Sequence, residues 1–337
     1  MAKFPRFLII TSGIGAVVGG SVILKDFIVG NGQKLPETVR ADGKVCIVTG
    51  SNTGIGKETA MELARRGCKV YMACRDIEKC RKARAEIISD TLNQHVHCRK
   101  CDLADFESVR QFVTEFKTKE SKLDILINNG GIMRCPRKLT KQGIEMQLGV
   151  NHMGHFLLTN LLLDTLTSSA PSRIVNVSSI AHTRGTINFE DLNSEKSYDP
   201  GAAYNQSKLA NVLFTKELAE RLQGTGVIVN AVHPGIVKTE LGRHMGLENS
   251  IMASLFVKPL LSFFLKSPVQ GALTSIYVAL APSLENKTGK YFSDCKEKDP
   301  SEQAMDPIVA KRLWATSEKW TRLYNSDSSS PSLVAAM

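Results

Sequence analysis

Short apolar runs alternate with segments of helical spacing along most of the chain from residue 44 onward. Buried strands that alternate with helices are typical of a parallel sheet covered by helices on both faces. The pattern therefore predicts a doubly wound α/β fold with a parallel sheet. Its predicted strands span 45–49, 69–74, 96–101, 124–128, 173–178 and 227–232, and its predicted helices span 55–66, 76–89, 108–117, 146–166 and 203–222.

The segment before residue 44 does not follow this alternation. Residues 7–24 (FLIITSGIGAVVGGSVIL) carry no charge, and Lys3 and Arg6 precede them. Their length is near the lower limit for a membrane-spanning helix, about 17–25 residues. A secretory signal peptide has a similar start but needs a cleavage pattern that is missing here, and a buried first helix is the other alternative. The sequence predicts a membrane anchor over 1–28 and a polar linker over 29–43.

The alternation breaks again after Thr239. Residues 251–265 (IMASLFVKPLLSFFL) are apolar but are interrupted by Lys258 and Pro259, so they fit no core strand. The tail over 325–337 is polar and rich in serine, a composition that predicts disorder. Between the linker and the tail, the pattern predicts one domain over 44–324.

Composition and charge exclude several classes of protein. The 337 residues are 42% hydrophobic and 23% charged, near globular averages, which excludes collagen-like, low-complexity and wholly disordered chains. The formal net charge of +10 is compatible with nucleic acid, an anionic membrane or phosphate-bearing ligands. Because no nucleic-acid-binding motif accompanies the charge, we expect no nucleic-acid partner.

Eight cysteines are scattered singly along the chain. Small secreted disulfide scaffolds are shorter and denser in cysteine, so free thiols in a reducing compartment are expected. Cys98 and Cys101, preceded by His95 and His97, resemble half of a zinc site. A tetrahedral site needs a second pair of ligands, and none follows at ligand spacing, so the sequence predicts no metal.

The first predicted strand leads directly into a glycine-rich turn, TGSNTGIG over residues 49–56, and then into a helix. Glycines let the backbone turn sharply and let a pyrophosphate approach the helix N-terminus, where free N–H groups and the helix dipole favour an anion. A purely structural turn is the alternative, but the strand–turn–helix context favours a ligand. The motif predicts a dinucleotide site formed by Gly50, Asn52, Thr53, Gly54, Ile55 and Gly56.

The end of the second predicted strand bears on the choice of dinucleotide. Arg75 stands where an acidic residue would bind the ribose 2′-hydroxyl of NAD. A guanidinium suits a 2′-phosphate, and Lys79 and Arg81 add positive charge, so the sequence favours NADP(H). Asp76 could still accept a hydrogen bond from a ribose hydroxyl, and the basic residues could be a solvated helix start.

Tyr204 and Lys208 are four residues apart in a predicted helix, so their side chains share one face. A phenol with a pKa of about 10 is a poor base at neutral pH. A nearby ammonium favours the phenolate and would lower that pKa, which would make Tyr204 a proton shuttle.

Together these pieces resemble the short-chain dehydrogenase/reductase family. The resemblance covers about residues 44–295. Besides the glycine turn and the Tyr204–Lys208 pair, the matching residues are Asp102-Leu103, Asn128-Asn129, Asn151, Ser178-Ser179 and PGIVKT over 234–239. The segments NHMGHF (151–156), INFEDLNSEKSY (187–198), ELGRH (240–244) and GKYF (289–292) are similar to the retinol dehydrogenase branch of that family.

The resemblance implies a Rossmann fold and a role for each matching residue. Tyr204 would transfer the proton, and Ser179, with Ser178 as the second choice, would hydrogen-bond the reacting oxygen. Lys208 would bind the nicotinamide ribose, and Asn151 would hold a water that connects Lys208 to solvent. Tyr204 would also contact the cofactor, and the remaining implied cofactor contacts are Asp102, Leu103, Asn129, Val237 and Thr239.

Two features depart from the usual pattern of the family. Gly130 stands where the family's Asn-Asn-Ala-Gly motif has alanine, which adds backbone freedom worth about 1 kcal/mol. The interval between Ser179 and Tyr204 is longer than in compact members, and the extra residues belong to the 187–198 segment shared with the retinol dehydrogenase branch.

The implied activity is NADP(H)-dependent interconversion of retinol and retinal, or of similar lipophilic alcohols and aldehydes. The apolar residues 251–265 fall in the implied substrate loop, 236–268, although a packing helix at a subunit or domain interface would also be apolar. A carbonyl reductase for steroids or lipid aldehydes and a non-catalytic nucleotide-binding membrane scaffold are the alternatives. The resemblance also implies a membrane location, in the mitochondrial inner membrane or alternatively the endoplasmic reticulum, and allows a homodimer.

Overall fold

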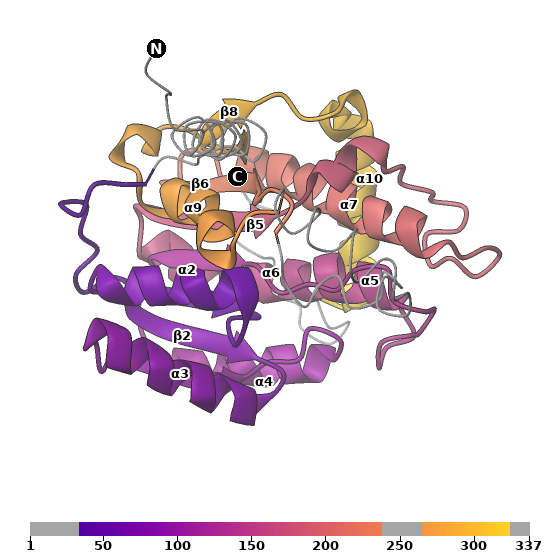
Figure 1. Cartoon of the computed structure of the whole chain (residues 1–337). Helices are drawn as coiled ribbons and strands as arrows, with labels where there is room; N and C mark the ends of the chain where they lie inside the picture. Colours follow the sequence, from indigo (N-terminus) through magenta and orange to yellow (C-terminus); the bar gives the residue numbers. More distant parts are fainter. Residues whose placement is uncertain (1–33, 238–264, 324–337) are drawn as a thin grey trace, which may run out of the picture.

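Eight strands form one sheet in the computed structural model, which describes residues 34–237 and 265–323 (Figure 1). The strand order is β3-β2-β1-β4-β5-β6-β7-β8, and all neighbours are parallel except β7 and β8. The predicted parallel α/β fold is confirmed, with an antiparallel edge strand added. The strands are β1 (Val45–Thr49), β2 (Lys69–Cys74), β3 (Val96–Lys100), β4 (Ile125–Asn128), β5 (Ser172–Val177), β6 (Val227–His233), β7 (Tyr291–Ser293) and β8 (Lys296–Lys298).

Helices cover both faces of the sheet because successive strand side chains point to opposite faces. In β1, Cys46 and Val48 pack into a core with α2 (Gly54–Arg65), α3 (Ile77–Thr91) and α9 (Pro268–Leu280). The alternate residues Val45 and Ile47 pack into the opposite core. That core is covered by α4 (Phe106–Lys117), α6 (Gly154–Ser168), α7 (Pro200–Arg221) and α10 (Pro307–Thr321).

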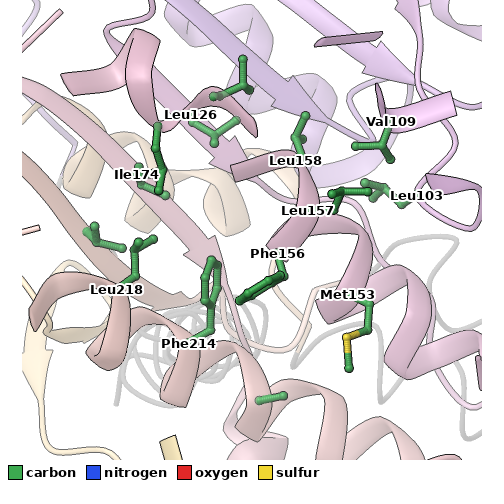
Figure 2. Packing of buried hydrophobic residues seen from close by; sticks show 14 of the residues in the cluster. Leu103, Val109, Leu126, Met153, Phe156, Leu157, Leu158, Ile174, Phe214 and Leu218 are labelled. Atoms are coloured by element: carbon green, nitrogen blue, oxygen red, sulfur yellow. The ribbon is translucent and has the colours of Figure 1, made fainter. Parts of the chain in front are cut away.

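Aromatic side chains join the helices of the second core (Figure 2). Phe156 of α6 lies 5.3 Å from Phe214 of α7 and 4.9 Å from Trp314 of α10, measured between ring centroids. Such ring contacts add specific geometry to the burial of large apolar area. They hold α7, which carries Tyr204 and Lys208, against α6 and α10.

The predicted continuous helix over 146–166 is interrupted in the structure. It consists of α5 (Met146–Leu148), the π-helical turn η1 (Gly149–Met153) and α6. A Cβ on Gly149 would lie 2.3 Å from Thr140 Cγ2, and one on Gly154 would lie 2.5 Å from the Leu103 carbonyl oxygen. Close packing at these two glycines accompanies the wider turn, and such turns are frequent at functional sites.

Several elements have no counterpart in the sequence prediction. These are α9, α10, the strands β7 and β8, and the 3₁₀ turns η2 (Ile180–Arg184), η5 (Pro282–Leu284) and η6 (Glu302–Met305). The predicted anchor over 1–28, most of the substrate loop and the tail over 325–337 lie outside the described residues. Among the helices within 34–237 and 265–323, none has the length and apolarity needed to cross a bilayer.

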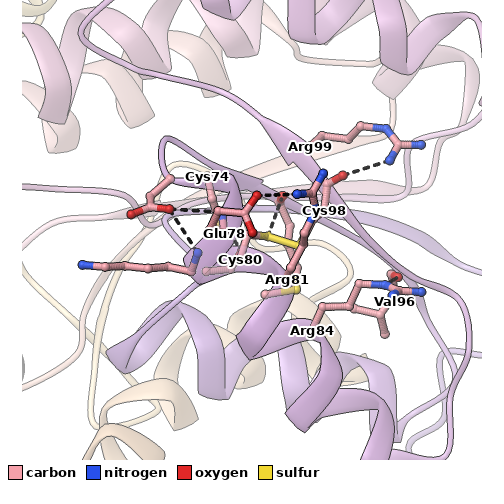
Figure 3. Close-up of a disulfide and its surroundings, with 12 residues drawn as sticks. Cys74, Glu78, Cys80, Arg81, Arg84, Val96, Cys98 and Arg99 are labelled. Carbon is pink, nitrogen blue, oxygen red and sulfur yellow. Dashed lines mark hydrogen bonds and ion pairs between the residues drawn. A yellow bond between two sulfur atoms is a disulfide. The ribbon is translucent and has the colours of Figure 1, made fainter.

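A disulfide joins Cys80 of α3 to Cys98 of β3 (Figure 3). The expectation of free thiols is therefore wrong for these two cysteines. It rested on spacing along the sequence, whereas the fold lays α3 over β3 and brings the two Cα atoms to 5.9 Å, within the range of disulfides. The remaining cysteines are all buried, and Cys46, Cys68, Cys74, Cys101 and Cys135 are free thiols.

Replacing Cys80 by serine is expected to lower the free energy of unfolding by about 3 kcal/mol, because the bridge closes a loop of 18 residues in the unfolded chain. Urea unfolding without reductant measures the loss. Cys98→Ser should lose as much, and the double variant should lose no more than either single one. A wild-type protein whose stability does not change on addition of a dithiol reductant would contradict this prediction.

Candidate active site

A cavity of about 390 Å³ lies at the carboxyl ends of β1, β2, β3 and β4. The strand order reverses between β1 and β4, and ligands of open α/β sheets bind at such a switch point. The structure brings most of the predicted cofactor residues together here. The cavity is lined by Gly50, Asn52, Thr53, Gly54, Ile55, Gly56, Arg75, Asp102, Leu103 and Asn129 among others.

The glycine turn is shaped by close backbone packing. Gly50 has φ +62°, and a Cβ there would lie 2.7 Å from Gly130 Cα. A Cβ on Gly56 would lie 2.4 Å from Asn129 Nδ2. The N-cap residue of α2, Thr53, makes no side-chain cap hydrogen bond, and the first turn carries no acidic residue. The N–H groups at the start of α2 therefore remain available to an anion.

Thr49 and His155 fix the loop that follows β4, and the sequence prediction missed both. Thr49 Oγ1 accepts the N–H groups of Asn129 and Gly130 at 2.9 and 2.8 Å and lies 2.8 Å from His155 Nε2. His155 Nδ1 lies 3.0 Å from the Asn151 carbonyl oxygen, so Nδ1 carries the ring proton and Thr49 donates to Nε2. Burial lowers the pKa of His155 to about 4, which keeps this ring neutral.

Arg75 and Lys79 are exposed basic residues on the wall of the cavity. Neither forms an ion pair with any residue of the described ranges, whereas Arg81 pairs with Glu78 and does not line the cavity. Asp76 Oδ1 caps α3 by accepting the N–H groups of residues 78 and 79 at 3.1 and 3.0 Å. The two free cations favour a phosphate, and helix capping occupies one oxygen of Asp76.

Tyr204, Ser179 and Lys208 lie together next to the cavity. Tyr204 is buried, and the neighbouring Ser179 side chain acts to lower the pKa of its hydroxyl. Lys208 lies one turn further along α7, with Nζ 5.8 Å from the centroid of the Tyr204 ring and donating to the Val177 carbonyl oxygen at 3.0 Å. Ser178 Oγ donates to the Lys208 carbonyl oxygen at 2.7 Å, so it is engaged with the backbone of α7. The geometry therefore favours Ser179 over Ser178 as the serine that hydrogen-bonds the reacting oxygen.

The expected lowering of the Tyr204 pKa is wrong for the protein alone. Burial raises the pKa of Tyr204 to about 12, and the neighbouring Ser179 side chain opposes this only in part. Burial also lowers the pKa of Lys208 to about 8. Loss of water around both groups thus outweighs the influence of the ammonium on the phenol.

Asn151 connects this group to the cavity wall. Its Nδ2 donates to the Ile132 carbonyl oxygen and to Ser207 Oγ, both at 2.9 Å, and its Oδ1 accepts the Ile132 N–H at 2.9 Å. A Cβ on Gly131, which lines the cavity, would lie 3.1 Å from Asn151 Oδ1 and 3.7 Å from Lys208 Nζ. Both Nδ2 hydrogens of Asn151 and one lone pair of its Oδ1 are therefore engaged, and two of these three bonds hold the loop beside Lys208.

The last two predicted cofactor residues follow β6. A Cβ on Gly271 would lie 2.7 Å from Val237 Cγ2 and 3.1 Å from Ile55 Cγ1, which places Val237 beside the glycine turn. Thr239 lies outside the described residues.

Comparison with known proteins agrees with this geometry. The profile of the short chain dehydrogenase family matches residues 44–249. The chain belongs to this family. It is 53% identical over 315 residues to retinol dehydrogenase 13 of Mus musculus, covering 93% of this chain and 94% of that protein. The short-chain dehydrogenase assignment makes the chain an oxidoreductase, and the cavity fits a nicotinamide cofactor through its uncapped helix start and free cations.

Two solved structures are similar to this short-chain dehydrogenase. An uncharacterized protein from Mycobacterium paratuberculosis has a TM-score of 0.69 and 36% identity, covering 86% of this chain and 98% of that one. A short chain dehydrogenase from Shigella flexneri complexed with NADP has a TM-score of 0.60 and 25% identity, covering 77% and 100%.

The sequence prediction missed most of the cavity wall contributed by the loop after β4. These residues carry no motif, and only the fold brings them to the cavity. They include Ile132, Cys135, Pro136 and Lys138, and Met146 of α5 and Val150 of η1 line the cavity as well. The departure at Gly130 also has a geometric reason, because a Cβ there would lie 2.9 Å from Leu103 Cδ1 and 3.3 Å from Thr49 Oγ1.

Replacing Lys208 by methionine is expected to raise the free energy of unfolding at pH 7 by about 3 kcal/mol, since each pKa unit is worth about 1.4 kcal/mol. The folded state holds the ammonium at a cost because burial lowers its pKa to about 8. The Val177 carbonyl keeps a donor, Asn211 Nδ2, at 3.1 Å. Denaturation at several pH values should show the difference shrinking between pH 8 and about 10.4, the ordinary lysine value, where the unfolded lysine also loses its proton. A variant less stable than wild type at pH 7 would contradict the prediction.

Proposed function

We propose that the protein is an NADP(H)-dependent oxidoreductase that interconverts retinol and retinal or similar lipophilic alcohols and aldehydes. The observation that carries the proposal is the buried Tyr204, next to the Ser179 side chain and one helical turn from Lys208, beside the cavity at the strand ends. The name of the mouse relative supports the retinoid substrate.

The bound cofactor supplies the hydride in carbonyl reduction and accepts it in alcohol oxidation. Tyr204 donates its phenolic proton to the carbonyl oxygen during reduction and removes the hydroxyl proton during oxidation. Burial keeps Tyr204 protonated at neutral pH, which is the state that reduction requires. Ser179 donates a hydrogen bond to the same oxygen and stabilises its developing charge, while Lys208 supplies positive charge next to the phenol.

The cofactor would be held by residues from five strand ends. The glycine turn and the start of α2 would bind the pyrophosphate, and Arg75 with Lys79 would bind a 2′-phosphate. Asn129 lines the same cavity. Asp102 and Leu103 would flank the adenine, and Val237 and Thr239 would contact the nicotinamide amide, as the family resemblance implies.

Exposed apolar side chains beside the catalytic group support a lipophilic substrate. Ile180 directly follows Ser179 and is 52% exposed, and Ile236 in the turn after β6 is 66% exposed. Large apolar groups that remain exposed near a site favour contact with an apolar ligand. Residues 236–268 would extend this surface as the substrate loop.

A membrane would supply such a substrate. Residues 7–24 are apolar and uncharged, which supports an anchor in the mitochondrial inner membrane or, alternatively, the endoplasmic reticulum. The homodimer stays a prediction.

Turnover of all-trans-retinal by the purified full-length protein tests the proposal. With NADPH in detergent micelles we expect reduction to retinol, at a higher kcat/KM than with steroids or medium-chain aldehydes. Robust reduction of those carbonyls without turnover of retinal would overturn the retinoid assignment. Nucleotide binding without reduction of any carbonyl would overturn the enzymatic proposal.

A further inference from the structure

One peptide group next to the proposed catalytic serine is held from both sides by histidine rings. The carbonyl oxygen of Ser179 lies 2.7 Å from His182 Nδ1, and the N–H of Ile180 donates to His233 Nδ1 at 3.3 Å. We propose that His182 and His233 are positioning residues that hold the Ser179–Ile180 peptide and thereby aim Ser179 at the reacting oxygen. The inference rests on the function proposed above.

The contacts of His182 define its tautomer. A carbonyl oxygen only accepts, so Nδ1 carries the proton and donates it to Ser179. The N–H of Ser301 donates to Nε2 at 3.2 Å, so Nε2 carries none. The ring is 1% exposed and lies 4.7 Å from the Tyr291 ring. His182 therefore ties Ser179 to the chain that follows β8.

His233 requires the opposite tautomer. Both of its partners at Nδ1 are backbone donors, the N–H of Ile180 at 3.3 Å and the N–H of Gly235 at 3.4 Å. Nδ1 must therefore be unprotonated, and the ring proton sits on Nε2. One ring thus links the turn after β5, which carries Ser179, to the turn after β6, which leads to Val237.

Both rings are held in the neutral state that these contacts need. Burial lowers the pKa of His182. It lowers the pKa of His233 to about 4, which Asp294 opposes and Lys266 reinforces. An added proton on either ring would place an N–H group against a backbone N–H group.

The arrangement matters for Ser179 because its own side chain has few anchors. The hydrogen bond that Ser179 Oγ makes is with the N–H of Ala181, which it accepts at 3.2 Å. Fixing the oxygen and the nitrogen of the following peptide fixes ψ of Ser179, which is 161°. A displacement of about 1 Å in a reacting group can reduce the rate about 10²-fold.

Paired substitutions separate positioning from general stability. His182→Ala and His233→Ala should lower kcat for retinal about 10- to 100-fold, with the Kd for NADPH unchanged. Asparagine places an amide N–H or a carbonyl oxygen near the position of Nδ1, so His182→Asn and His233→Asn should recover most of kcat. Amide hydrogen exchange at Ile180 should quicken in His233→Ala and slow again in His233→Asn. His97→Ala, at a half-buried histidine of β3 that does not line the cavity, is the control and should keep kcat.

The outcomes distinguish this inference from the function on which it rests. Alanine variants with wild-type kcat, or folded asparagine variants that stay as slow as alanine, would overturn the positioning role. Unchanged exchange at Ile180 in His233→Ala would overturn the contact itself. A wild-type protein that reduces no carbonyl would overturn the proposed function and the catalytic purpose of the two histidines, even if exchange confirmed that they hold the peptide.

Discussion

Tyr204→Phe is expected to lower kcat for retinal reduction by about 10²- to 10⁴-fold, the usual contribution of a positioned general acid. The substitution removes only the phenolic oxygen, the group whose pKa the neighbouring Ser179 side chain acts to lower. Tyr204 does not line the nucleotide cavity, so the Kd for NADPH should stay at the wild-type value. Steady-state kinetics and nucleotide titration of the same preparation measure both quantities.

A second buried tyrosine offers a matched control. The hydroxyl of Tyr71 in β2 donates to Glu120 at 2.5 Å, and Tyr71 does not line the cavity. Tyr71→Phe should therefore lose some stability but keep kcat. If Tyr204→Phe kept wild-type kcat, or if both variants lost it equally, Tyr204 would not be the proton donor.

Arg75→Asp is expected to reverse the preference between NADPH and NADH. A charge-assisted hydrogen bond is worth about 1.5–3 kcal/mol, so losing it should raise KM for NADPH about 10- to 100-fold, and the new negative charge adds repulsion. The aspartate can accept a hydrogen bond from a ribose 2′-hydroxyl, so KM for NADH should fall or stay unchanged. The ratio of kcat/KM for the two cofactors measures the effect.

Arg81→Asp is the control because it makes the same charge change at the start of the same helix. Arg81 is paired with Glu78 and does not line the cavity, so its loss should alter the cofactor ratio little. If Arg75→Asp left the NADPH preference intact, Arg75 would not be the residue that recognises the 2′-phosphate.

The strands β1 to β6 could be predicted from the sequence because most of them are short, mainly apolar runs between helical segments. The strands over 45–49 and 69–74 match β1 and β2. The last strands could not be found in this way. β7 and β8 have three residues each, and β8 is the exposed segment Lys296–Lys298, so neither produces a periodic signal. The Cys80–Cys98 disulfide could not be predicted from the sequence, because it depends on how α3 packs against β3 in the folded chain.

In the candidate site, too, some residues could be predicted from the sequence and others could not. The glycine turn, Arg75 and the Tyr204–Lys208 pair occupy strand ends or one helix face, so their spacing already predicted that they would meet. Thr49, His182 and His233 could not be singled out, because their roles come from hydrogen bonds between turns far apart in the chain. Desolvation could not be predicted either, and it reverses the expected direction of the Tyr204 pKa.

Transfer of deuterium from NADPH labelled at the reactive nicotinamide carbon tests the central claim most directly. The full-length protein would be incubated with all-trans-retinal and the labelled cofactor, and the product would be analysed by mass spectrometry, with Tyr204→Phe in parallel. The account predicts retinol that carries a single deuterium on the former carbonyl carbon, formed by the wild type and barely by the variant. Absence of labelled retinol from the wild-type reaction, or equal labelling by both proteins, would contradict it.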